Sequence, residues 1–166
     1  MVSVYCRVSL RTVSAFRTVS YEAVWIIAQM PPVKHLIEKR SRYYGRRSHI
    51  SREEEQKITI DQLQQRWVAA NSGRWTRRLI PNVGLWYGCQ HREVDFYVTL
   101  LLTRHGCFRF YQCRFKLDNI TECPGCQTGK ETVEHVFFTC ISLAAERSEL
   151  DSVWRMYHTR KWLTTW

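Results

Sequence analysis

The sequence lacks the features that place a protein in a membrane or outside the cell. None of its apolar runs approaches the roughly 18 residues of a membrane-spanning helix, and the longest near the start, 23–28, is far shorter. That run is also too short for a signal peptide, and no small-residue cleavage site follows it. Seven cysteines cannot all pair with one another, and four have the spacing of metal ligands. We therefore expect no membrane partner and an intracellular, reducing compartment.

The sequence also lacks the residues of a phosphoryl-transfer site. Such enzymes hold two metal ions with closely placed carboxylates, but the aspartates are isolated: Asp61, Asp95, Asp118 and Asp151. No glycine-rich phosphate loop is present, and the scattered histidines define no nucleophile and base. We therefore expect a noncatalytic protein with no small-molecule substrate.

Apolar and aromatic residues are abundant enough to build a core. Hydrophobic residues make up 45% of the chain and aromatic residues 13%, and 166 residues suit one domain of moderate size or two small helical lobes. No repeat of fixed period and no low-complexity segment is present. Most of the apolar spacing is helical, so we predict a mainly α fold, an irregular helical assembly with a small zinc knuckle near the C-terminus.

Local signals place most of the helices. We predict helices over 7–28 in two pieces, 33–47, 51–71, 93–104 and 143–157. Ser20 is the expected N-cap of the second piece, and Pro31-Pro32 ends it. Ser51 and Glu54 form a capping box at the start of the longest helix.

Three further segments carry weaker signals. Residues 74–81 have the composition of a connector rather than of a regular element, and 107–116 fit either a short helix or an extended segment. Within 93–104 the apolar spacing predicts that Tyr97 and Val98 point inward.

The positive charge is concentrated toward the N-terminus. The chain has 25 Lys and Arg against 15 Asp and Glu, a formal net charge of +10. Residues 1–50 carry a net +7, residues 51–122 carry +3, and residues 123–166 carry zero. An excess of this size indicates an acidic partner, and its distribution places the contacts upstream of residue 123.

Two clusters that mix basic and aromatic residues are candidate contacts for RNA or DNA. They lie within 39–47 and 74–78 and contain Lys39, Arg40, Arg42, Tyr43, Tyr44, Arg46, Arg47, Arg74, Trp75, Arg77 and Arg78. Basic side chains bind phosphates, and aromatic rings stack on bases. The alternative for the first cluster is a solvated face with its two tyrosines turned inward, because a charge run alone is usually only a surface.

The segment 123–140 holds a pattern typical of metal ligands. It spaces Cys123, Cys126, His135 and Cys140 as C-x2-C-x8-H-x4-C. Pro124-Gly125 suits the turn between the first two cysteines. Thr132 is the expected N-cap of a short helix that carries His135, with Cys140 just beyond the end of that helix. Three thiolates and an imidazole suit one structural Zn²⁺ and leave no open position for a catalytic water.

Two alternatives exist for this pattern. Cys-x-x-Cys also occurs as a redox pair, although here no βαβ unit flanks it and further ligands follow. The other alternative is a group of unligated buried thiols or a decayed site. Cys89, Cys107 and Cys113 have no comparable spacing, so we expect them not to bind the metal. Lys130 is the only formal cation within 123–140, so we expect a structural clamp rather than a phosphate-binding finger.

Several motifs together resemble a known family. They are His105-Gly106-Cys107-Phe108, Tyr111, Arg114-Phe115, Cys123-Pro124-x-Cys126 and Glu131-Thr132-x-Glu134-His135-Val136-Phe137-Phe138-x-Cys140, with Gly73-Arg74-Trp75-Thr76, Leu79-Ile80-Pro81 and 11–20 upstream. The combination resembles the C-terminal region of the polyproteins of non-LTR (LINE-like) retrotransposons of arthropods. It covers nearly the whole chain. The chain departs from the family after Tyr111, where Gln112 replaces a frequent leucine.

The resemblance implies a domain plan. Residues 1–50 resemble the segment that follows the polymerase palm, near the thumb, and 51–117 resemble a helical linker region. Residues 118–142 resemble the CCHC zinc knuckle, and 143–166 form a helical tail.

The resemblance also implies a function. The parent proteins are RNA-directed DNA polymerases, whereas this chain lacks the polymerase and endonuclease active sites. It therefore resembles a noncatalytic, nuclear fragment that helps to hold template RNA or target DNA during target-primed reverse transcription. The alternative is a zinc-stabilised helical module for protein–protein interaction, or a decayed remnant without binding activity.

Overall fold

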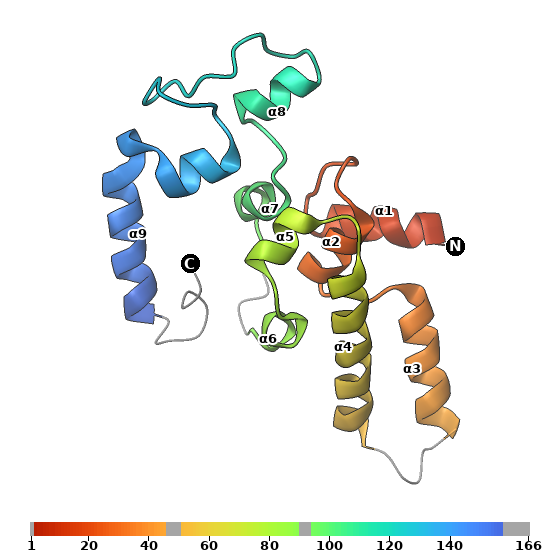
Figure 1. Ribbon diagram of the computed structural model, residues 1–166. Helices are drawn as coiled ribbons and strands as arrows, with labels where there is room; N and C mark the ends of the chain where they lie inside the picture. The colour runs from red at the N-terminus through yellow and green to blue at the C-terminus, as the bar shows by residue number, and fades with distance from the viewer. Residues whose placement is uncertain (1, 46–50, 90–93, 158–166) are drawn as a thin grey trace. The chain divides into compact units, whose positions relative to one another are not determined.

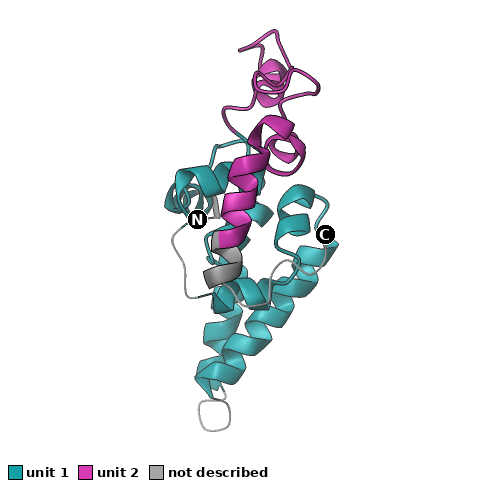
Figure 2. Cartoon of the chain, turned by 90° about the vertical axis from the view of Figure 1, so that its left-hand side faces the viewer, with its two compact units in different colours: residues 1–105 teal, residues 106–166 magenta. Residues whose placement is uncertain are grey.

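The computed structural model describes residues 2–45, 51–89 and 94–157, which belong to two compact units (Figures 1 and 2). Unit 1 is Met1–His105 and unit 2 is Gly106–Trp166. The predicted mainly α fold is confirmed, since these residues are mostly helical and their only β pairing is one isolated bridge. None of the described helices combines the length and apolar character that crossing a membrane requires. The unit boundary falls inside the predicted 51–117 segment.

The described part of unit 1 is built from helices of 6 to 18 residues. They are α1 Val2–Thr12, α2 Tyr21–Ile27, α3 Val33–Gly45, α4 Arg52–Ala69, α5 Arg74–Leu79, α6 Val83–Gly88 and α7 Phe96–Thr103 (Figure 1). α4 packs against α3 and α6, α2 packs against α1 and α7, and α5 packs against α7. Two predicted helix starts are confirmed: Ser20 accepts a hydrogen bond from the Ala23 amide, and Ser51 and Glu54 make both bonds of a capping box.

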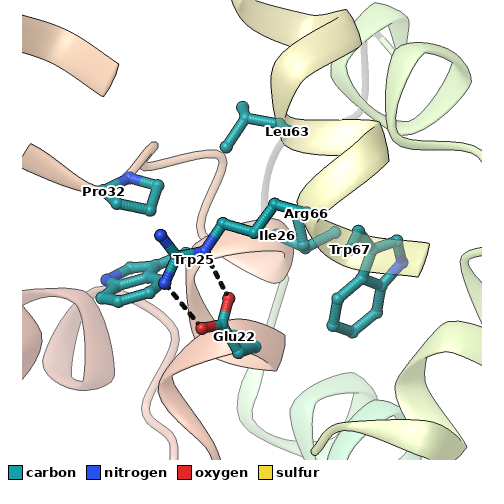
Figure 3. Close-up of a pocket in the computed structure, with 7 residues that line it drawn as sticks. All are labelled: Glu22, Trp25, Ile26, Pro32, Leu63, Arg66 and Trp67. Atoms are coloured by element: carbon teal, nitrogen blue, oxygen red, sulfur yellow. Dashed lines mark hydrogen bonds and ion pairs between the residues drawn. The ribbon is translucent and has the colours of Figure 1, made fainter. Parts of the chain in front are cut away.

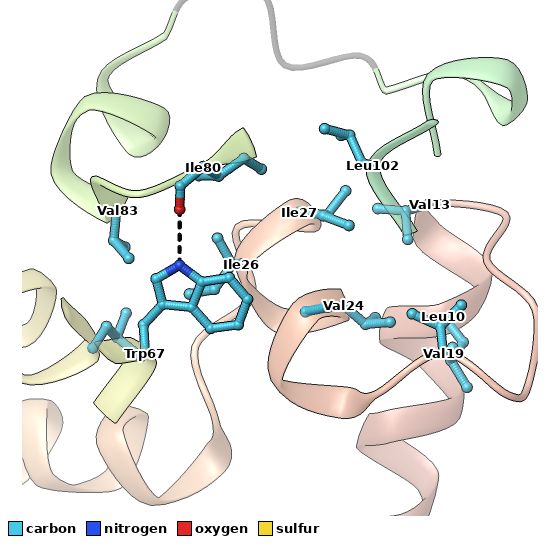
Figure 4. Packing of buried hydrophobic residues seen from close by; sticks show 12 residues of the cluster. Leu10, Val13, Val19, Val24, Ile26, Ile27, Trp67, Ile80, Val83 and Leu102 are labelled. Carbon is cyan, nitrogen blue, oxygen red and sulfur yellow. Dashed lines mark hydrogen bonds between the residues drawn. The ribbon is translucent and has the colours of Figure 1, made fainter. Parts of the chain in front are cut away.

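The core of unit 1 surrounds Trp67 of α4 (Figure 4). Its indole Nε1 donates a hydrogen bond of 2.8 Å to the carbonyl oxygen of Ile80, in the connection between α5 and α6. The buried cluster comprises Leu10, Val13, Val19, Ala23, Val24, Ile26, Ile27, Leu63, Trp67, Ile80, Val83 and Leu102. Because these residues come from α1, α2, α4, α6, α7 and the connections between them, one apolar cluster holds most of unit 1 together.

Two ion pairs join other helices to α4. Arg66 donates to both carboxylate oxygens of Glu22 in α2, at 2.7 and 3.0 Å, and its guanidinium lies 5.1 Å from the ring centroid of Trp25 (Figure 3). Arg42 of α3 donates from Nε to Oε2 of Glu55 at 2.9 Å, and the Glu55 side chain is fully buried. These pairs tie α2 and α3 to α4.

Unit 2 has less regular structure. It contains α8 Arg109–Arg114, a π-helical turn η1 His135–Thr139, a 3-10 turn η2 Ile141–Leu143 and α9 Ala144–Tyr157. Between α8 and η1 the chain forms a narrow hairpin with its bridge at Glu122 and Lys130. Oε2 of Glu131 accepts a hydrogen bond of 3.0 Å from the Arg109 amide, which joins the hairpin to the start of α8.

The structure corrects the predicted helix over 7–28. The first helix covers 2–12 and ends before the tight connection 13–20, in which Ser14 has a left-handed φ of 51°. Phe16 therefore lies in a connection and is 40% exposed. Val13 and Val19, which the pattern placed on a helix, still reach the core, but from this connection.

Two other expectations are also wrong. The segment predicted as a connector, 74–81, contains α5, which begins after Gly73, a residue with a left-handed φ of 68°. α7, which Asp95 caps, packs against α2 and α5 through a different face from the predicted one. Tyr97 is consequently 74% exposed and Val98 40%, whereas residues 99, 100, 102 and 103 are buried. Of the two possibilities for 107–116, the helix α8 is the one observed.

Candidate metal centre and nucleic-acid interface

Four side chains of unit 2 converge on one point. The ligand atoms of Cys123, Cys126, His135 and Cys140 all lie within 4.8 Å of one another. The Sγ atoms of Cys123 and Cys140 are 3.7 Å apart, and Sγ of Cys126 is 3.1 Å from Nε2 of His135. Two sulfurs bound to a tetrahedral ion at about 2.3 Å lie about 3.8 Å apart. These four residues can therefore hold one metal ion.

The hairpin places the first two cysteines. The Cys123 amide donates to the Gly129 carbonyl at 2.7 Å, and the Glu131 amide donates to the Thr121 carbonyl at 2.7 Å. Inside this frame the Gln127 amide donates to the Cys123 carbonyl at 2.9 Å, which closes a tight turn around Pro124-Gly125. Both sulfurs therefore point toward the centre.

Gly125 is needed for a different reason from the expected one. Its backbone does not have a left-handed φ, so bending alone does not require glycine. A Cβ at this position would instead collide with the hydroxyl of Ser142, and that hydroxyl lies 2.9 Å from Sγ of Cys140. The absence of a side chain lets η2 approach the cysteine turn closely.

The π-helical turn η1 brings the other two ligands together. Thr132 caps its start as predicted, since its hydroxyl accepts a hydrogen bond of 3.1 Å from the His135 amide. At the end of the turn the Cys140 amide donates to the His135 carbonyl, five residues back, at 2.7 Å. In an α-helix residues five apart point about 140° away from each other. The wider π turn reduces this angle and lets His135 and Cys140 face one centre.

Thr139 orients the imidazole. Its hydroxyl lies 3.2 Å from Nδ1 of His135 and 3.3 Å from the His135 carbonyl oxygen. The hydroxyl can donate to the carbonyl and accept from the Nδ1–H, which leaves Nε2 with its lone pair toward the sulfurs. Metal-binding histidines commonly have such a partner on the second nitrogen.

Hydrogen bonding also lowers the pKa of one of the thiols, that of Cys126. The hydroxyl of Thr128 donates a hydrogen bond of 3.2 Å to Sγ of Cys126. This bond, together with a bond from the Thr128 amide, lowers the pKa of Cys126 from 9.0 to about 6. His135 contributes to the lowering. Burial raises the pKa of Cys123, although the Cys126 and Gly125 amides partly oppose it. These contacts favour the thiolate form of Cys126, which is the form that binds a metal ion.

The donor set determines what the centre can do. Four protein ligands fill a tetrahedral site, so no position remains open for a substrate or a catalytic water. Within the described part of the chain, no other group of His, Cys, Asp or Glu comes together in this way. None of the remaining cysteines belongs to this group. Sequence spacing predicted the ligands but not Thr128 and Thr139. Thr128 is two residues after Cys126, and Thr139 is four residues after His135. A search for hydroxyl side chains close to each ligand would have found both.

The first predicted nucleic-acid cluster lies mostly at the end of α3. Arg40 is exposed and its guanidinium lies 5.4 Å from the ring centroid of Tyr44, which is 57% exposed. Tyr43 is half-buried, and Lys39 forms a hydrogen bond with the side chain of Gln56. Two of the predicted residues, Arg46 and Arg47, lie outside the described residues.

Arg42 has a clear structural role. Besides its ion pair with the buried Glu55, its Nη2 lies 3.3 Å from Oγ1 of Thr59. Its guanidinium is therefore directed into the α3–α4 contact. Of the predicted residues in this cluster, Arg40 and Tyr44 are the exposed pair.

The second predicted cluster also contains one arginine that stabilises the fold and others that are exposed. Nη1 of Arg77 donates to the carbonyl oxygens of Trp67 and Ala70, both at 2.7 Å, so this arginine satisfies the end of α4. Arg74 and Arg78 are exposed on α5. The indole Nε1 of Trp75 donates to the Leu101 carbonyl at 2.7 Å, which fixes the ring against α7.

The two clusters do not merge into one. The first lies beside the start of α4 and the second follows its end, and an 18-residue helix is about 27 Å long. Arg104 joins the second cluster from the far end of α7, with its guanidinium 5.4 Å from the Trp75 ring centroid. No local sequence signal could have found Arg104, because the contact depends on the packing of α5 against α7.

No protein-family model matches the chain, and no curated protein or solved structure matches it either. The candidate metal centre of unit 2 and the exposed cations of unit 1 are therefore the features that indicate a function.

Proposed function

We propose that the chain is a noncatalytic nucleic-acid-binding module in which unit 1 binds RNA or DNA. The observation that carries this proposal is the division of charge. Residues 1–105 contain seventeen Lys and Arg against eight Asp and Glu, a net +9, whereas residues 106–166 contain eight against seven, a net +1. A phosphate backbone attracts such a unit strongly.

The exposed aromatic contacts of unit 1 support the same proposal. Arg40 lies on Tyr44 in α3, and Arg78 and Arg104 lie on Trp75 at 5.8 and 5.4 Å. An arginine stacked on a ring is held in place while its outer N–H groups stay available to a phosphate.

In the same proposal, unit 2 holds one structural Zn²⁺ through Cys123, Cys126, His135 and Cys140. Three thiolates and one imidazole are a soft, four-coordinate donor set, which zinc prefers. With the ion bound the centre has a net charge of −1, so we do not expect it to bind phosphates. Its role is to stabilise unit 2. The reducing, intracellular compartment that free thiols need belongs to the proposal as well.

The resemblance of the sequence to non-LTR retrotransposon polyproteins supplies a biological setting for this function. In that setting the chain corresponds to the part of a reverse transcriptase polyprotein that follows the polymerase. It would act in the nucleus and hold template RNA or target DNA during target-primed reverse transcription. The motifs around Cys123 and His135 support this setting.

The test of nucleic-acid binding compares two cations in matched surroundings. Arg40 lies on Tyr44 in unit 1 and Lys130 lies 5.7 Å from the ring centroid of Phe110 in unit 2, and both are exposed. Binding of the chain to a labelled RNA hairpin and to a short DNA duplex is measured by fluorescence anisotropy at several salt concentrations. We expect Arg40→Ala to lower the slope of log K against log salt by about 0.7–0.9 and Lys130→Ala to leave it unchanged.

Each result decides between the units. If the wild-type chain binds neither probe, the proposed function is wrong. If Lys130→Ala flattens the slope while Arg40→Ala does not, unit 2 contains the binding surface and the division of roles is reversed.

The metal assignment is tested separately by elemental analysis. We expect one zinc per purified chain, and we expect Cys140→Ser to lose tight zinc binding. Cys107→Ser is the matched control, because Cys107 is exposed and lies outside the centre. Full, tight zinc occupancy in Cys140→Ser would refute the ligand set.

A second candidate function is protein–protein interaction through unit 2. Its favouring observation is the exposure of large apolar side chains: Leu117 is 77% exposed, Ile141 71% and Leu150 60%. Surfaces of this kind often mark docking sites. This alternative predicts that the chain binds neither nucleic-acid probe, so the titrations above distinguish it.

A further inference from the structure

Arg104 adopts a backbone conformation that arginine rarely takes. It is the C-cap of α7, with φ 59° and ψ 32° in the left-handed region. This conformation is unfavourable for a residue with a Cβ, whereas glycine adopts it freely. A strained residue of this kind invites a search for the function of its side chain.

The strained backbone directs the side chain onto a fixed aromatic ring. The Arg104 guanidinium lies 5.4 Å from the ring centroid of Trp75, and the Arg78 guanidinium lies 5.8 Å from the same centroid. The ring itself is held by its hydrogen bond to the Leu101 carbonyl, and the neighbouring Thr76 hydroxyl donates to the Leu102 carbonyl at 2.8 Å. One indole therefore carries two arginines from two packed helices.

Arg104 is exposed, and within the described part of the chain it forms no ion pair with a carboxylate. Its stacked face is occupied by the indole, so its N–H edges are the groups that remain to bind a ligand. Guanidinium edges match the oxygens of a phosphate in geometry and charge.

We propose that Arg104, positioned by Trp75, binds the phosphodiester backbone of a nucleic acid. This inference rests on the proposed function and deepens it. It assigns a contact to Arg104 that the sequence did not indicate, and it changes the role of Trp75. Because arginines cover the indole, Trp75 is a positioning residue for phosphate contacts and not a platform for bases.

Arg104 also has a possible structural role that the test must separate. A cation at the C-terminal end of a helix interacts favourably with the helix dipole. If this were its only role, replacing it would destabilise α7 and leave binding unchanged. If it binds phosphate, replacing it with glycine relieves the backbone and weakens binding.

The experiment uses Arg104→Gly with Lys116→Gly as its matched control. Lys116 is also an exposed cation in the left-handed region, with φ 58°, but it lies in unit 2. Both substitutions remove one positive charge and one strained side chain. Binding is measured by anisotropy with a labelled single-stranded oligonucleotide and with an abasic strand of the same length, and thermal unfolding is followed by circular dichroism.

We expect Arg104→Gly to weaken binding about five- to eightfold at about 0.1 M salt and to lower the salt slope by about 0.7–0.9, as loss of one phosphate contact does. The effect should be equal on the abasic strand. Lys116→Gly should bind like the wild type, and neither variant should unfold at a lower temperature. If Arg104→Gly does unfold earlier, Arg104→Asn repeats the test, since asparagine tolerates this conformation.

The outcomes separate this inference from the proposed function. If the wild-type chain binds neither strand, the proposed function fails first. If the wild type binds and Arg104→Gly or its Asn counterpart binds equally well, the phosphate contact is wrong while the proposed function stands. If the loss disappears on the abasic strand, the contact is to a base, and the phosphate assignment is again wrong.

Discussion

The two units of this chain are stabilised in different ways. Among the described residues, unit 1 buries fifteen apolar side chains and unit 2 buries four: Phe108, Cys123, Val133 and Cys140. Two of the four are candidate metal ligands. Unit 1 can therefore fold on an apolar core, whereas we expect unit 2, with its few buried side chains, to depend on a metal ion at this centre.

The same division applies to charge. Unit 1 has a net charge of +9 and unit 2 a net charge of +1. A large net charge destabilises a compact state by self-repulsion. Two ion pairs of unit 1, Arg42 with Glu55 and Arg66 with Glu22, offset part of this repulsion. The unit with the larger apolar core therefore carries the charge, and the unit with the candidate metal centre is nearly neutral.

Removal of the metal should give the largest difference in stability between the two units. We expect a strong chelator to unfold the segment 118–142 and to leave unit 1 folded, because the free energy of metal binding supplies the folding energy of such a site. Amide hydrogen exchange read residue by residue is the measurement. Protection should disappear at Cys123 and Cys140 and persist in α2 and α4.

A Cys140→Ser variant provides the control without a chelator, and it should show the same pattern. Equal loss of protection in both units would show that they fold as one cooperative body. Unchanged protection in unit 2 would show that its small apolar contacts suffice without metal.

The reciprocal experiment removes the centre of the apolar core. Trp67→Ala should destabilise unit 1 by about 3–5 kcal/mol, since it opens a large cavity in the buried cluster. Zinc stoichiometry should stay at the wild-type value, because the metal centre lies wholly in unit 2. Urea unfolding followed by circular dichroism, with elemental analysis of the same sample, measures both quantities. Loss of zinc from the variant would contradict the separation of the units.

The sequence predicted the parts of the molecule that local spacing determines. The four ligand positions, the capping box at Ser51 and the cap at Thr132 all depend on residues a few positions apart. The buried face of α7 was missed because it is decided by packing against α2 and α5.

Contacts between distant segments could not be predicted in this way. Arg42 and Arg77 belong to runs of basic residues, and nothing in those runs shows that one pairs with Glu55 and the other with the end of α4. A charge run in a sequence therefore mixes arginines that stabilise the fold with arginines that remain exposed. Only the packing separates the two groups.

The pairing of Arg42 with Glu55 tests that separation directly. Arg42→Met leaves the Glu55 carboxylate buried without its cation, which should destabilise unit 1 by about 3 kcal/mol, near the lower end for such pairs because Arg42 is partly exposed. The double variant Arg42→Met/Glu55→Leu should recover most of this loss, since no buried charge remains. Urea unfolding measures the stabilities. A single variant as stable as the wild type would show that Arg42 does not serve the fold.

The smallest expected effect is on zinc affinity, through the lowered pKa of the Cys126 thiol. Thr128→Val removes the hydroxyl that is the largest cause of the lowered pKa of Cys126, and loss of such a partner weakens metal binding about 10- to 100-fold. A lowered pKa favours the thiolate, so between about pH 6 and pH 9 the wild type binds zinc without first losing the Cys126 proton. The variant must lose that proton, so its deficit should widen as pH falls from 9 toward 6 and should shrink above 9. Competition with a chromophoric chelator at pH 6.5 and 9 measures the affinities, and Thr121→Val is the control because Thr121 lies in the same hairpin and makes no contact with a ligand sulfur. A deficit that stays constant across this range would show that Thr128 acts by packing and not through the charge of Cys126.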